Sequence, residues 1–286
     1  MCNFMNKLVL VRYIVFLFLS VIFIPSFAQT VFHFPKKNIE LVEYIVTYSL
    51  EFQEDSMYQN FKRQEDMLLF IGPTVSRFVS YNYFIGDSMA RTATSQEDFQ
   101  RIASDRVNPL PLVRFRYEIF KNYPKGKQTF IDSVLGGGMF KFEEDLALFK
   151  WELLNETTII SGYKAQKATT EFGGRKWVVW FSTEIPFNDG PYKFNGLPGL
   201  IVKVYDTHQH YVFELKSIHK PGHKLFIGFP ELDYIESTKK DYFKAKDNMR
   251  DNIITQAKSA GLNNEVQQKV AKTMQRRNNP IELDRK

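Results

Sequence analysis

Cysteine is almost absent from this chain, and its absence excludes several kinds of chemistry. The only cysteine among the 286 residues is Cys2. It lies in an N-terminal stretch with the pattern of an export signal, so we expect the exported product to contain no thiol. A disulfide framework, a thiolate metal site and a cysteine nucleophile are then all excluded. Because Cys2 precedes the apolar run of the signal instead of following it, we also expect no lipoprotein anchor.

Long hydrophobic runs are also missing beyond the N-terminus. The longest, such as residues 67–71, are strand-sized and far below the ~20 residues that a membrane span needs. The one long run, residues 8–24, follows Lys7 and is followed by Ser26 and Ala28, which suit the −3 and −1 positions of a cleavage site. This predicts a signal peptide over residues 1–28, cleaved before Gln29, and a periplasmic product that is not an integral membrane protein. An uncleaved membrane anchor is the alternative, but the run is short for that role.

The short motifs of common catalytic and cofactor-binding sites are missing as well. The sequence contains no G-x-S-x-G, H-E-x-x-H, P-loop, G-x-G-x-x-G or EF-hand pattern. Carboxylates do surround the most distinctive loop, at Glu184, Asp189 and Asp206, but their spacing does not require an acid–base pair, and we expect them on the surface. We therefore assign no catalytic residue and no cofactor, and we favour a non-enzymatic protein.

The positive charge is too small and too dispersed for nucleic-acid binding. Lysine and arginine number 38 against 32 acidic residues, and the two signs are interleaved. A nucleic-acid surface needs a basic stripe with exposed aromatic side chains. The densest basic group near the C-terminus is expected to form the solvated face of a helix. It consists of Lys269, Lys272, Arg276 and Arg277.

Aromatic side chains, by contrast, are abundant, and the patterns around them predict strands. Phenylalanine, tyrosine and tryptophan make up 15% of the chain, and they suit strands and can fill a core or line an apolar cavity. In residues 38–50 the even positions from Val42 to Leu50 are all apolar or aromatic, which predicts one half-buried strand. Glycine- and proline-containing or polar turns predict three hairpins. They join residues 67–71 to 76–81, residues 163–172 to 175–183, and residues 199–206 to 210–218.

Helices are expected mainly at the C-terminal end. Ser95 caps a short predicted helix over residues 95–105. After Ser237 the sequence becomes charged and takes helical spacing up to Gly261, and a second helix is predicted over residues 263–277. The expected fold class is mainly β or α+β, an antiparallel meander of eight to ten strands with C-terminal helices. The expected organisation is a signal peptide (1–28), a β domain (29–236) and a helical segment (237–286).

The most tightly specified stretch is GPYKFNGLPGLIVKVYD, residues 190–206. Gly190 and Pro191 form a turn by composition, and Gly196 and Gly199 can adopt positive φ. Pro198 fixes its own φ and restrains the preceding residue to an extended form. These residues predict a shaped loop that leads into a strand.

Apolar side chains in and near this loop are candidates for its anchors or for contact with a ligand or partner. Phe194, Leu197 and Leu200 are expected to hold the loop to the core. Trp177 and Trp180 are three residues apart, so a strand directs them to opposite faces. One of them packs in the core, and the other is free to contact a ligand, a partner or solvent.

Five short motifs, in this order, carry a family resemblance: GYK (162–164), WF (180–181), IP (185–186), GPYKF (190–194) and GLPGL (196–200). Together they resemble the GLPGL family of Bacteroidota, also called Porph_ging. The resemblance implies an exported protein of no established activity. Members often have a cysteine directly after GYK, where this chain has Ala165.

The order of strands and turns is also similar to the meander of LolA/LolB-type periplasmic carriers. That similarity implies a curved sheet or half-barrel closed by helices, a shape suited to apolar ligands. The favoured function is a periplasmic binding protein for an apolar ligand (a lipid or acyl chain) or for an outer-membrane or envelope protein. The candidate contact residues are Trp180, Phe194, Leu197, Pro198 and Leu200.

Two other functions stay open. The first is an envelope assembly or docking module that uses the GLPGL loop as its contact surface. The second is a metal-dependent hydrolase that uses Asp206, His208 and His210, which share one face if the strand continues through them. A polar hairpin turn explains these three residues without a metal, and we favour the turn.

Overall fold

Strands dominate the computed structural model, which describes residues 35–58, 61–259 and 261–284. Within those residues the strands are β1 (Lys36–Leu41), β2 (Tyr44–Phe52), β3 (Arg63–Ile71), β4 (Ser76–Ser80), β5 (Glu118–Lys121), β6 (Lys127–Val134), β7 (Gly138–Asp145), β8 (Glu152–Ile160), β9 (Tyr163–Phe172), β10 (Arg175–Ser182), β11 (Leu200–Asp206), β12 (Tyr211–His219), β13 (Phe226–Pro230) and β14 (Tyr234–Glu236). The helices are α2 (Tyr81–Ala90), α3 (Gln96–Ser104), α4 (Lys239–Asp251), α5 (Ile253–Ser259) and α6 (Asn264–Gln275).

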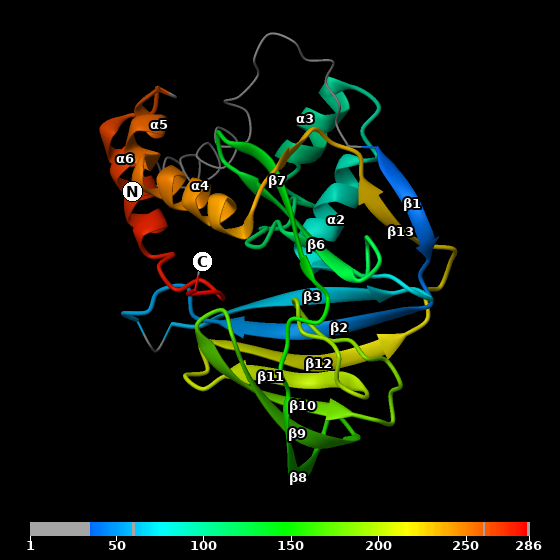
Figure 1. Ribbon diagram of the computed structural model, residues 1–286. Helices are drawn as coiled ribbons and strands as arrows, with labels where there is room; N and C mark the ends of the chain where they lie inside the picture. The colour runs from blue at the N-terminus through cyan, green and yellow to red at the C-terminus, as the bar shows by residue number, and fades with distance from the viewer. Residues whose placement is uncertain (1–34, 59–60, 260, 285–286) are drawn as a thin grey trace.

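Twelve of these strands form one open sheet in the order β14-β7-β6-β5-β4-β3-β2-β12-β11-β10-β9-β8. Every neighbouring pair is antiparallel except β14 with β7. β1 and β13 pair separately, on the right of Figure 1. The mainly-β prediction and the three predicted hairpins are confirmed. The strand count is higher than the expected eight to ten, because β1, β13 and β14 are short and lack a clear alternating pattern.

One face of the sheet encloses the main core. Strands from both halves of the sheet contribute to it, and Tyr48 on β2 donates a hydrogen bond to the carbonyl of Ile201 on β11 at 2.8 Å. The opposite face is covered over β3–β6 by the β1/β13 pair and by α2. The inner core also contains residues from the loop between β10 and β11, so the chain itself occupies the space inside the curve.

The strand predicted over residues 38–50 is in fact two strands, with a corner at Val42 and Glu43. The amide of Val42 donates to the carbonyl of Leu225, whereas the next amide, that of Glu43, donates to Ile71 on β3. Adjacent residues thus bond to two different sheets. The apolar positions change from odd numbers (Ile39, Leu41) to even numbers (Val42, Tyr44) at this corner, so a change of phase in the sequence marks the break.

The helical predictions hold for α3 and α6 but miss α2. Ser95 caps α3 as expected, and Asn263, at the predicted start of α6, caps that helix. α2 follows β4 directly, is capped by Ser80, and turns Tyr83 and Phe84 toward the outer core. The helix expected up to Gly261 is interrupted at Asn252, which separates α4 from α5. Among the described residues, no helix is both long and apolar enough to cross a bilayer.

The C-terminal helices contribute to two separate hydrophobic cores. α4 packs Tyr242 into the main core, where its hydroxyl donates to Asp132 of β6 at 2.5 Å. α5 and α6 bury a small core of their own, built on Ile253, Val266 and Val270. Figure 1 shows the three helices together at the upper left, with the chain returning from α6 to the sheet. That return brings the C-terminal segment, residues 278–284, against the concave side.

The two tryptophans of β10 provide a test of which face is the core. Trp177 is fully buried and donates to the carbonyl of Phe172 at 3.0 Å, whereas Trp180 is half-buried on the other face. We expect Trp177→Ala to lower the free energy of unfolding by about 3–5 kcal/mol, because it leaves a large cavity. Trp180→Ala should cost about 1 kcal/mol. Urea unfolding measures both, and equal losses would contradict this assignment of faces.

Candidate functional site

The loop between β10 and β11, residues 183–199, lies inside the curve of the sheet. It carries most of the motifs on which the resemblance to the GLPGL family rests. Residues 190–195 are all buried, as are Leu197 and Gly199. Backbone hydrogen bonds tie the loop to its neighbours: Leu200 donates to Ile185 at 3.0 Å and Ile201 donates to Asp189 at 2.9 Å. The buried part of the loop therefore belongs to the folded interior, whereas a second set of its residues is exposed: Thr183, Glu184, Pro186, Asn188, Gly196 and Pro198.

Glycine is required at this loop for two different reasons. A Cβ at Gly199 would lie 2.2 Å from the carbonyl oxygen of Ser182, a distance that no side chain can occupy. A Cβ at Gly190 would lie 2.8 Å from Ile201. A Cβ at Gly196 would make only an ordinary contact, 3.7 Å from Nε1 of Trp151, but the residue has a φ of +88°, in the left-handed region that favours glycine. Close approach thus decides the first two positions, and backbone conformation decides the third.

The five predicted contact residues do not form one surface. Phe194, Leu197 and Leu200 are at most 1% exposed. The Phe194 ring lies 4.9 Å from that of Trp177. Trp180 is half-buried on the outer face, where Lys167 lies 5.9 Å from its ring, and Pro198 is exposed. The structure therefore buries three of the five in the core, and only Trp180 and Pro198 are open to a partner.

A lysine sits at the centre of the buried loop. Lys193 is fully buried and forms ion pairs with Glu144 on β7 and with Glu282 of the C-terminal segment, the latter at 2.6 Å. Its ammonium also lies 5.1 and 5.2 Å from the rings of Phe130 and Phe142. Two carboxylates and aromatic faces thus replace the water that the charge loses.

Glu282 collects several partners inside the molecule. Lys193, Lys239 and the hydroxyl of Tyr192 all contact its carboxylate. Burial alone would raise the pKa of Glu282, but the two ammonium groups outweigh burial and hold the pKa below its ordinary value. The carboxylate is therefore charged at neutral pH and links the GLPGL loop to the end of the chain.

A second buried cation, Lys121 on β5, holds the start of the loop. It pairs with Asp189 at 2.6 Å and donates to the carbonyls of Gly190 and Phe194 at 2.6 and 3.0 Å. Ser76 donates to the other oxygen of Asp189 at 2.5 Å. Burial lowers the pKa of Lys121, and the Asp189 carboxylate opposes that shift. The loop is thereby fixed to β4 and β5 as well as to its own strands.

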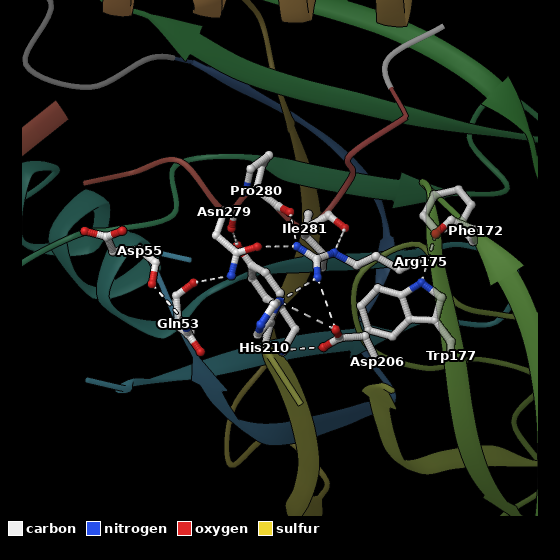
Figure 2. A network of polar contacts seen from close by, with 11 residues as sticks. Gln53, Asp55, Phe172, Arg175, Trp177, Asp206, His210, Asn279, Pro280 and Ile281 are labelled. Atoms are coloured by element: carbon white, nitrogen blue, oxygen red, sulfur yellow. Dashed lines mark hydrogen bonds and ion pairs between the residues drawn. The ribbon is translucent and has the colours of Figure 1, made fainter. Parts of the chain in front are cut away.

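Arg175, at the start of β10, joins the sheet to the C-terminal segment (Figure 2). Its guanidinium pairs with Asp206 at 3.1 Å. It also donates to the side chain of Asn279 at 2.7 Å and to the carbonyls of Pro280 and Ile281 at 2.6 and 3.0 Å. One side chain thus satisfies three successive residues of the segment.

This network includes two residues of the weak metal candidate, Asp206 and His210. β11 ends at Asp206 and the next residues form the expected turn. The Asp206 carboxylate is buried against Arg175, whose guanidinium also lies 3.1 Å from Nδ1 of His210. The rings of His208 and His210 stack with centroids 5.4 Å apart. A guanidinium therefore stands where a metal would be needed, and within the described residues no three potential ligands converge on an ion.

The expected surface placement of the carboxylates is right for Glu184 and wrong for Asp206 and Asp189. Glu184 is exposed, Asp206 is fully buried, and Asp189 is largely covered in its pair with Lys121. Burial preferences favour the surface for single carboxylates, but a paired cation removes that preference. The partners lie far away in sequence, so no local spacing announces them.

The buried cations Arg175, Lys193 and Lys121 were not predicted from the sequence. For Lys193 one signal was present: it lies between Tyr192 and Phe194 in a stretch that has no other charge until Lys203. Lysine is almost never fully buried unless it is paired, so the sequence did not establish that this ammonium is inside. For Arg175 and Lys121 no such signal exists.

The fold and this interior define a class: an open antiparallel sheet closed from within by its own loop and its own C-terminal segment. Residues 173–203 match the family described as "Protein of unknown function (Porph_ging)". This match confirms the resemblance drawn from the sequence, and it covers the β10 strand and the whole GLPGL loop. A search of the curated proteins finds no match to the chain.

Among solved structures the chain is similar to PNGF-II, in structures titled for its P21 and C2 space groups. Sequence identity is 15% in both, with TM-scores of 0.48 and 0.50. The alignments cover 73% of this chain but 34% and 33% of the other, so the chain spans about one third of the length of PNGF-II. The likeness concerns the fold alone, and the similarity to LolA/LolB-type sheets stays a prediction.

Substitution of the two glycines of the GLPGL motif is expected to lower the free energy of unfolding by different amounts. Gly199→Ala should lower the free energy of unfolding by about 3 kcal/mol or more, because the new methyl overlaps the Ser182 carbonyl. Gly196→Ala should cost about 1–2 kcal/mol, the penalty of a left-handed backbone for a non-glycine residue. Urea titration of both variants provides the comparison, and equal losses would show that close approach is not the reason for Gly199.

Glu282 is expected to make stability depend on acid. Because its folded pKa lies below the ordinary 4.5, its contribution is complete above that pH and is lost as the pH falls through the folded value. Glu282→Gln should lower the free energy of unfolding by about 3 kcal/mol at pH 7, since it breaks a buried pair. It should also flatten the pH dependence of the melting temperature below pH 5.

The matched control is Glu156→Gln, which removes an exposed partner of Lys167. Such a surface pair is worth under about 1 kcal/mol. If both variants melt alike, Glu282 does not hold the C-terminal segment.

Proposed function

We propose that this protein is an exported, non-enzymatic docking module of the cell envelope, whose contacts are made on its outside. The export signal predicted over residues 1–28 would place the protein in the periplasm, and these residues lie outside the described part of the chain. The proposal keeps the partner-binding half of the sequence-based prediction. It moves the contact surface away from the interior of the sheet and away from the buried part of the GLPGL loop.

The observation that carries this proposal is the filled interior. In a half-barrel carrier the concave face must be open to receive an acyl chain. Here that face is covered by Tyr192, Lys193 and Phe194 from the loop, each at most 2% exposed, and by Glu282 from the C-terminal segment. A ligand could enter only if the chain withdrew these residues and left buried charges without partners, which is costly.

The two other functions receive less support. In the GLPGL motif, residues 196–200, only Gly196 and Pro198 are exposed. Two small exposed residues are too few for a docking surface. A hydrolase would need Asp206 and His210 free to bind a metal, but both face Arg175. An interior that fixes the shape, with contacts outside, agrees best with these placements.

Solvent extraction separates a docking module from a lipid carrier. The exported protein would be purified without detergent and extracted with organic solvent, and the extract would be analysed by mass spectrometry beside an established lipid carrier. We expect only substoichiometric lipid, because the interior is occupied by the chain. One acyl lipid per protein molecule would overturn the proposal and restore the carrier hypothesis.

A further inference from the structure

One corner of the molecule exposes large apolar side chains close together. Met57, Tyr58 and Phe61 follow β2, and their side chains are 81%, 57% and 58% exposed. We call these three residues the aromatic corner. In Figure 1 this part of the chain projects beyond the left ends of β2 and β3. Water-exposed apolar side chains grouped in this way are typical of an interaction site.

The chain fixes the base of this corner. Asn278 accepts hydrogen bonds from the amide and hydroxyl of Ser56 at 2.9 and 2.7 Å and donates to Asp55 at 2.9 Å. The Asp55 carboxylate also accepts from the amide of Met57 at 3.1 Å. The exposure of Met57 is therefore imposed by polar contacts that the C-terminal segment makes.

Positive charge surrounds the corner. Lys272 and Arg276 from the end of α6 line the same shallow pocket as Met57 and Tyr58, and the Arg276 guanidinium lies 5.5 Å from the Tyr58 ring. Arg63 lies 4.8 Å from the Phe61 ring. Among the described side chains, no carboxylate lies within ion-pair distance of Lys272 or Arg276.

The nearby carboxylates leave the charge unbalanced. Glu54 contacts both Arg63, at 2.6 Å, and Arg277, at 3.9 Å, so one acid serves two cations. Arg114 is near the charges of Arg63 and Arg277, but also near those of Glu54 and Glu65. Asp55 lines the pocket with Lys272 and Arg276, so five cations are set against three carboxylates. The corner therefore combines projecting apolar side chains with a net positive rim.

We propose that the aromatic corner and its basic rim bind the surface of a membrane that contains anionic lipids. This rests on the proposed docking function and names the lipid surface as the partner. Anionic headgroups complement the unpaired cations, and the projecting apolar side chains enter the boundary between headgroups and acyl chains. Arginine and lysine suit this position because their stems lie along apolar surface while their charges stay with the headgroups.

The geometry favours a lipid surface over an acidic protein. Met57 projects with four fifths of its surface in water, and a flat membrane can receive such a side chain without a matching pocket. The cations are spread over β3, the end of α6 and the segment beyond it, and lipid headgroups adjust to such spacing because they move laterally. Each basic residue near an anionic surface contributes about 1 kcal/mol, and the effect weakens with salt.

Vesicle co-sedimentation tests the proposal with the exported protein, its N-terminus verified by mass spectrometry in every variant. The probes are vesicles of phosphatidylcholine alone and vesicles with one third phosphatidylglycerol. We expect binding to the anionic vesicles only, and weaker binding at high salt. Lys272→Gln with Arg276→Gln should lower the partition coefficient on the order of tenfold. Met57→Asp should lower it by a similar factor.

Matched controls carry the same chemical changes elsewhere. Lys240→Gln with Lys244→Gln removes two exposed lysines from α4, and Val107→Asp changes a side chain that is 86% exposed. Both controls should bind vesicles like the unchanged protein. Melting temperatures of all variants verify that the fold is intact.

Three outcomes would overturn the lipid proposal: no binding to anionic vesicles, equal losses in the controls, or binding that does not respond to the corner variants. Capture of an envelope protein through the same corner, without vesicle binding, would also overturn it but would leave the docking function standing. Stoichiometric lipid in the interior would instead remove the docking function. The two failures are therefore distinguishable.

Discussion

Buried positive charge organises this structure, and Lys193 is its centre. The ammonium lies inside an apolar core, where an unpaired charge could not remain. It requires Glu144 from β7 and Glu282 from the C-terminal segment, two carboxylates that are far apart in the sequence. Once they are in place, the GLPGL loop can only lie inside the sheet. The position of the loop and the position of the C-terminal segment therefore depend on each other.

Arg175 and Lys121 extend the same principle to the rest of the interior. Arg175 holds three successive residues of the C-terminal segment, and Lys121 holds the beginning of the loop through Asp189. Each cation also satisfies backbone carbonyls that no strand can pair. The sheet can stay open because its concave side is closed by polar contacts of this kind. The same segment, through Asn278, sets the conformation of the aromatic corner outside.

The interior and the exterior of the protein therefore have separate roles. The residues that match the Porph_ging family build the inside. Gly199 is needed for a close approach and Phe194 for packing, so the most recognisable part of the sequence acts on architecture. The exposed chemistry lies elsewhere, on the loop after β2 and on the end of α6. A recognisable motif and a contact surface need not coincide in such a fold.

The sequence by itself determined the strands with clear alternation or glycine turns, the capped helices and the resemblance to the family, because those signals are local. It also indicated that Trp177 and Trp180 face opposite ways. The corner at Val42 was not predicted, although the apolar positions change from odd to even numbers there. Only the tertiary structure decided that Lys193, Arg175 and Asp206 are buried and paired, because their partners lie 31 to 106 residues away. Burial of a charge depends on what the fold brings beside it, and no local pattern contains that information.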